Sequence, residues 1–152
     1  MLIGLSCLVA VSCYKTPTYP DTPAIEFDKY DISSDVYEIG TDGNLRIKFT
    51  DGDGDLGKQS NSDSVRNFFI KVLQYPIRDS LILPIIPQKG TSNAISGTID
   101  IKLTSLISTD YCTFNVFKRP TDTLNFEIKI VDRAGHESNT LSPPALVVSC
   151  NP

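Results

Sequence analysis

The chain has few of the residues that helical proteins and many enzymes rely on. Its 152 residues include no tryptophan, one methionine and one histidine, and alanine and glutamine are also scarce. β-Branched and aromatic residues are plentiful, a balance that favours strands over helices. Ten prolines and nine glycines can supply the turns that many short strands require. The composition therefore predicts one all-β domain of ordinary size.

An excess of basic residues is also missing. The chain has 14 lysines and arginines against 18 aspartates and glutamates, which gives a formal net charge of −4. An acidic chain without a basic stripe repels a phosphate backbone, so we expect no nucleic-acid partner.

The residue patterns of common catalytic sites are absent as well. The single histidine, His136, lies in a predicted turn, and no serine stands in a G-x-S-x-G nucleophile elbow. No glycine-rich phosphate loop occurs. One histidine with Cys112 or Cys150 falls short of the four ligands of a zinc site. We therefore predict that the protein is not an enzyme.

The longest uncharged apolar run, at residues 1–11, is too short to span a bilayer. The small residues Ala10 and Ser12 then lead to Cys13, as in a signal segment. This arrangement resembles the lipobox of bacterial lipoproteins, although Ala10 stands where leucine is usual and no basic residue precedes the run. The resemblance implies a signal peptide at 1–12, a lipidated Cys13 and membrane attachment through that lipid. The alternatives are a cleaved secretory signal and a buried amino-terminal strand.

Residues 13–23 are rich in proline and threonine, as suits a tether between a lipid anchor and a domain. The domain itself is predicted at 24–152. If Cys7 leaves with the signal and Cys13 carries lipid, Cys112 and Cys150 remain, and an oxidising compartment would allow them to form a disulfide. Two separate thiols are the alternative.

Apolar residues recur at alternate positions along the body of the chain, as in half-buried strands. Leu45, Ile47 and Phe49, for example, alternate with Arg46 and Lys48. The clear strand predictions are 24–30, 44–49, 67–75, 96–103, 124–131 and 145–149, and the weaker ones are 36–39, 81–86 and 111–117. Seven to nine short strands without a convincing helix predict a β-sandwich, with at most one helical turn at 103–108.

Two segments sharpen this expectation. Residues 126–139 (FEIKIVDRAGHESN) resemble the penultimate strand and following turn of bacterial Ig-like domains, with His136 where asparagine is common. Residues 49–57 (FTDGDGDLG) resemble a loop of small lipoproteins from Bacteroides-type bacteria. The resemblance implies a single immunoglobulin-like or fibronectin-III-like β-sandwich in an outer membrane lipoprotein, facing the periplasm or the cell surface. It implies no chemistry.

The most chemically distinctive segment is an acidic loop, in which Asp51, Asp53 and Asp55 alternate with glycines. Such spacing can direct several carboxylates at one hard cation such as Ca²⁺, which takes 6–8 oxygen ligands. An EF-hand is excluded because Leu56 replaces its glycine and flanking helices are missing. In an Ig-like topology the loop after 124–131 lies at the same pole, and would add Asp132 and Asn139 as ligands. The alternatives are a solvated Asp/Gly turn and, for Asp132, a turn-forming role.

Residues 81–87 (LILPIIP) are apolar but interrupted by prolines, which predicts a protected edge strand or, alternatively, an exposed patch for a partner. Our leading functional hypothesis is a non-catalytic, membrane-tethered Ig-like module with a binding or scaffolding role in the cell envelope. A calcium-dependent binder of a ligand such as a glycan is the second hypothesis, and a hydrolase is the third and least favoured.

Overall fold

The computed structural model describes residues 18–74, 78–87, 93–107, 111 and 120–150. Within these residues the chain is nearly all β, with one four-residue helix. The elements in order are β1 (Ala24–Asp31), β2 (Tyr37–Glu38), β3 (Asn44–Asp51), β4 (Phe68–Val72), β5 (Arg78–Leu81), β6 (Ile95–Lys102), α1 (Leu103–Leu106), β7 (Thr121–Leu124), β8 (Phe126–Ile130) and β9 (Leu146–Ser149).

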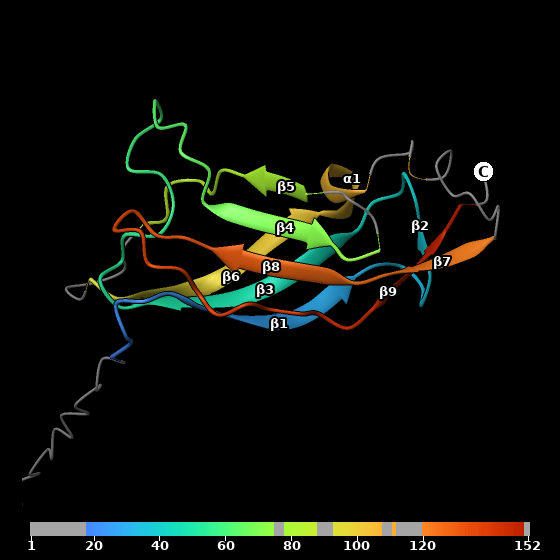
Figure 1. The fold of residues 1–152 in the computed structure, drawn as a ribbon, viewed down its shortest axis with the longest axis horizontal. Helices are drawn as coiled ribbons and strands as arrows, with labels where there is room; N and C mark the ends of the chain where they lie inside the picture. Colours follow the sequence, from blue (N-terminus) through green and yellow to red (C-terminus); the bar gives the residue numbers. More distant parts are fainter. Residues whose placement is uncertain (1–17, 75–77, 88–92, 108–110, 112–119, 151–152) are drawn as a thin grey trace, which may run out of the picture.

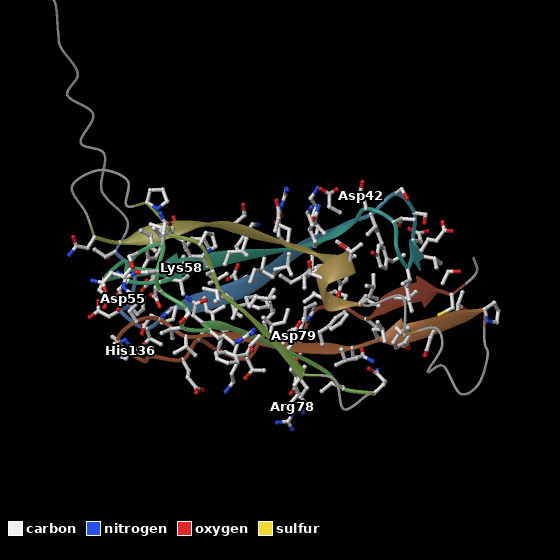
Figure 2. The ribbon with its side chains drawn as sticks, turned by 90° about the horizontal axis from the view of Figure 1, so that it is seen from above. Asp42, Asp55, Lys58, Arg78, Asp79 and His136 are labelled. Atoms are coloured by element: carbon white, nitrogen blue, oxygen red, sulfur yellow. The ribbon has the colours of Figure 1, made fainter. Side chains whose placement is uncertain are left out.

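The strands form three small sheets, ordered β1-β3-β6, β5-β4-β8 and β2-β9-β7. The first two sheets are antiparallel and lie face to face as two layers (Figure 2). The third lies at one end of these layers, where β2 pairs with β9 in parallel (Figure 1). This arrangement is compatible with a β-sandwich.

The core lies between the two layers and is built by alternation along the strands. On β3, Leu45 and Ile47 are fully buried, and on β8 Phe126, Ile128 and Ile130 are as well. Their neighbours in sequence point outward because successive side chains of a strand face opposite sides of its sheet. The alternation in the sequence therefore predicted the inward face of both strands correctly.

Strand boundaries differ from the sequence-based predictions where a strand changes partner. The predicted strand 124–131 is divided at Asn125 into β7, which pairs with β9, and β8, which pairs with β4. Leu124 and Phe126 are buried on either side of this point, so the alternation carries no sign of the division. The predicted strand 67–75 ends at Val72, and Leu103 begins α1.

The predicted edge strand at 81–86 is only partly a strand. β5 ends at Leu81, and beyond it Leu83 is buried while Ile85 is 47% exposed and forms an isolated bridge with Gly57. Most of the predicted strand 111–117 lies outside the described residues. In the described part of the chain, no helix is long and apolar enough to cross a membrane.

The sheet register brings two loops to the end of the sandwich opposite the β2-β9-β7 sheet. β3 ends at Asp51 and β8 at Ile130, and the loops that follow them lie together there, with Asp55 and His136 at the same end in Figure 2. We call this end the acidic pole. The amino-terminal segment that leads into β1 also reaches the sandwich at this pole (Figure 1).

Candidate metal centre

Four carboxylates gather at the acidic pole. Asp51, Asp53, Asp55 and Asp132 each place one oxygen within 4.8 Å of the corresponding oxygens of the others. Asp51 is the last residue of β3, Asp53 and Asp55 lie in the loop that follows, and Asp132 lies two residues beyond β8. The structure thus brings together four of the five ligands that the sequence suggested.

The acidic loop folds back on itself around Asp51. The Leu56 backbone N–H donates to Asp51 Oδ2 at 2.9 Å, and the buried Leu56 side chain fixes the return of the chain. Gly57 has a φ of +86°, and a Cβ at this position would lie 2.3 Å from the Pro84 carbonyl oxygen. A side chain at this position would clash with the backbone, and residues with a Cβ rarely adopt this positive φ. Both reasons explain why glycine ends the acidic loop.

Asp132 is held by a tight turn of its own. Its Oδ1 accepts the His136 backbone N–H at 2.7 Å, and its Oδ2 lies 2.9 Å from His136 Nδ1. The Asp132 side chain is fully buried, whereas that of His136 is 46% exposed. The turn-forming role considered for Asp132 is therefore present, and it orients the carboxylate toward the acidic loop. The Arg133 backbone N–H donates to the Asp55 carbonyl at 3.4 Å and joins the two loops.

Three carboxylate oxygens in the cluster are buried without hydrogen bonds. Oδ1 of Asp51, of Asp53 and of Asp55 has no partner among the described residues. Asp51 is the clearest case, because the whole residue is 0% exposed. A buried polar atom normally finds a partner, and a buried anion needs one more strongly. Three such oxygens accept from no donor among the described residues, and carboxylates gathered this closely would fit a cation between them.

The electrostatics agree with this interpretation. The pKa of Asp51 is raised to about 6, first by burial and then by the neighbouring charges of Asp53 and Asp55. The pKa of Asp55 is also raised, first by burial and then by Asp132 and Asp53. Like charges at close range disfavour ionisation unless something neutralises them. A divalent cation would remove both penalties at once.

The chemistry of the donor set selects a hard cation. All four candidate ligands are carboxylate oxygens, which suit Ca²⁺, Mg²⁺ or Mn²⁺ rather than Zn²⁺ or copper. Separations within 4.8 Å fit inside the shell of Ca²⁺, whose diameter is about 4.6–5.2 Å from Ca–O distances of about 2.3–2.6 Å. The Asp-Gly loop also suits the flexible geometry of calcium better than the strict octahedron of magnesium.

Asn139 has a different task in the structure. Its Oδ1 accepts from the Ile25 N–H at 2.9 Å and its Nδ2 donates to the Ile25 carbonyl at 3.0 Å. The side-chain amide therefore makes the two hydrogen bonds that a neighbouring strand would make at the outer edge of β1. It protects this part of the edge from pairing with another chain. We leave Asn139 out of the ligand set. Asp63, another acidic residue near the loop, instead accepts backbone N–H groups of Gln59 and Val65.

The remaining predicted sites are only partly within the described residues. Cys150 is disulfide-bonded. Cys112, which the sequence suggested as its partner, lies outside the described residues, and so does the predicted lipidation site Cys13. His136, which the sequence placed in a turn, is exposed at the surface and is also the partner of Asp132. Its spacing of four residues after Asp132 was the available signal.

Comparison with family models, with curated proteins and with solved structures finds no match to this chain.

Proposed function

We propose that the protein is a non-catalytic Ig-like β-sandwich module of the bacterial cell envelope, and that a Ca²⁺ ion at its acidic pole stabilises its loops. The observation that carries the calcium proposal is the fully buried Asp51, whose Oδ1 has no partner in the described structure and lies among three further carboxylates. An ion held there would join the loops after β3 and β8. It would stabilise the fold of these loops and would take no part in a reaction.

The surroundings of the cluster support a structural ion. The unpartnered Oδ1 atoms of Asp51, Asp53 and Asp55 are shielded from solvent, and the Asp132 side chain is fully buried. An ion that recruits an external ligand, such as a glycan hydroxyl, needs an accessible coordination position. The burial of these oxygens therefore counts against the second hypothesis, a calcium-dependent ligand binder.

Other features support a non-catalytic role. His136 already pairs with Asp132, in a turn where no nucleophile is its partner in the described structure. Two surface hollows lie over the outer faces of the sheets, one beside Phe69 and Lys129 and one beside Lys48 and Gly97. Neither of these hollows is lined by a residue of the acidic cluster. A surface with these two hollows suits a binding or scaffolding role better than a catalytic one.

The proposed location in the outer membrane, facing the periplasm or the cell surface, rests on the lipobox-like start and the tether at 13–23. The disulfide at Cys150 supports export, because disulfides persist in oxidising compartments. A lipid on Cys13 would make the membrane the constant partner of the module. An envelope protein or glycan would be its second partner.

Calcium binding is tested by thermal melting together with isothermal titration calorimetry. One ion binding only the folded state at 100 times its dissociation constant adds about 2.7 kcal/mol, which for a domain of this size raises the Tm by roughly 8–10 °C. We expect this rise with Ca²⁺, a smaller one with Mg²⁺ and reversal by chelator. A protein that takes up no Ca²⁺ in the titration and shows no shift would contradict the proposal.

Membrane attachment is tested by the substitution Cys13→Ala. A lipid-modified cysteine is the only attachment that the proposal invokes, so the variant should leave the membrane fraction and lose labelling by a radioactive fatty acid. Cys7→Ala is the matched control and should retain both properties. Retention of lipid label in Cys13→Ala would show that the anchor lies elsewhere.

A further inference from the structure

The segment that precedes β1 lies directly on the acidic loop. The backbone N–H of Gly52 donates to the Pro20 carbonyl oxygen at 2.8 Å. Gly52 stands between Asp51 and Asp53, two of the proposed calcium ligands. We call residues 19 and 20 the strap, since they cross the loop where its carboxylates turn inward.

The contact between strap and loop depends on the absence of a side chain at Gly52. A Cβ there would lie 2.3 Å from the Tyr19 carbonyl oxygen and 2.6 Å from that of Pro20. Both neighbours are backbone atoms, which cannot rotate away. The strap continues the antiparallel pairing in which Ala24 lies opposite Thr50, after a bend at residues 21 and 22. Tyr19 is half-buried in this position.

We propose that the cation at the acidic pole controls the docking of the strap, so that the ion sets how firmly the preceding chain is held against the sandwich. This inference rests on the proposed calcium site and names what that site regulates. With calcium bound, the loop presents the Gly52 amide in a fixed position and the strap docks. With calcium removed, the strap, which belongs to the tether at 13–23, is released from the acidic loop.

The coupling has a direct physical cause. Without a cation, the charges of Asp51 and Asp53 repel each other on either side of Gly52, and the loop backbone between them loses its fixed geometry. A segment held by one backbone hydrogen bond and one half-buried side chain opens at small cost. Linkage is reciprocal, so a docked strap must also increase the affinity of the loop for the cation.

The first test uses Tyr19→Trp as a reporter, because the chain has no tryptophan of its own. Calcium should shift the emission of this single tryptophan to shorter wavelength and lower its quenching by acrylamide roughly twofold, as expected for a segment that closes on the domain. Adding Asp51→Asn to the reporter should remove both responses. Emission that stays constant while calorimetry records calcium binding would overturn the strap inference and leave the calcium site standing.

The second test measures calcium affinity in variants of the contact. Gly52→Ala should displace the strap and weaken calcium binding roughly fivefold, within the usual range of coupling between sites. Pro20→Gly loosens the strap without altering the loop and should weaken binding in the same direction. Gly97→Ala is the control, because its Cβ would meet only the Phe49 ring, at 3.2 Å, and it should bind as the unaltered chain does.

The outcomes of these two tests separate the two proposals. No calcium uptake by the unaltered chain would overturn the proposed function. Calcium uptake with equal affinity in Gly52→Ala, Pro20→Gly and the unaltered chain would overturn the strap inference alone. If Gly52→Ala does not fold, Pro20→Gly and the tryptophan reporter decide the matter.

Discussion

Replacing Asp51 by asparagine is expected to abolish the calcium-dependent rise in melting temperature and, at the same time, to make the calcium-free protein more stable at pH 8. The first effect follows because Asp51 supplies a buried, unpartnered oxygen at the centre of the cluster. The second follows because an asparagine carries no charge to bury and none to oppose Asp53 and Asp55. We expect the variant to be about 1–2 kcal/mol more stable than the unaltered chain without calcium. With calcium it should be about 1 kcal/mol less stable, because it lacks the roughly 2.7 kcal/mol that the ion adds to the unaltered chain.

The pH dependence of the calcium-free protein provides an independent check. Because the pKa of Asp51 is raised in the folded state to about 6, its protonation favours folding. This contribution is fully present below the pKa of the unfolded chain and is lost as the pH rises through about 6. Acidification from pH 8 to pH 5 should therefore add about 1.4 kcal/mol to the calcium-free protein. In Asp51→Asn this contribution should disappear, and only the smaller gain from the raised pKa of Asp55 should remain.

Calcium reverses the sign of that dependence, because protons compete with the ion for the same carboxylates. The calcium-loaded protein should lose stability between pH 8 and pH 5. Asp42→Asn is the matched control, since it removes one exposed negative charge far from Asp55, toward the other end of the sandwich (Figure 2). It should keep the full response to calcium. A full calcium response in Asp51→Asn would remove this residue from the site.

Replacing Phe126 by alanine should cause the largest loss of stability among these substitutions. Phe126 is 0% exposed, begins β8 and pairs with Val72 of β4 immediately after the chain leaves β7. Truncation of a buried phenylalanine costs about 3–5 kcal/mol, because burial is lost and a cavity remains. For a domain of this size the Tm should fall by roughly 10–15 °C.

Urea denaturation measures this loss directly. A control variant and a second measurement show whether the loss comes from the core. Glu127→Ala changes the next residue, which points outward and pairs with Lys71 at 3.3 Å, and it should cost less than about 1 kcal/mol. Below its melting temperature, Phe126→Ala should still bind calcium with unaltered affinity, because the substitution lies in the core and not in the loops. Equal losses for Phe126 and Glu127 would contradict the assignment of the two faces of β8.

The sequence determined the β-rich character of the chain, the inward faces of its main strands and the existence of an acidic loop. Each of these depends on local order: a strand has a period of two residues, and aspartates separated by glycines are visible in any conformation. Alternation placed Leu45, Ile47 and Ile128 in the core, and all three are fully buried. The membrane anchor at Cys13 remains a prediction from the sequence.

The tertiary structure decided which residues meet. Asp132 joins Asp51 because β3 and β8 end at the same pole, and no local pattern records that approach across about 80 residues. The change of partner at Asn125 was invisible because both partners bury the same face of the strand.

Asn139 was predicted as a ligand, but its amide pairs with Ile25, a contact set by the edge of β1 rather than by the acidic loop. The contact between the strap and Gly52 could not be predicted from the sequence either. A glycine in a sequence does not show which backbone atoms lie close to it, and only the fold brings Tyr19 and Pro20 there.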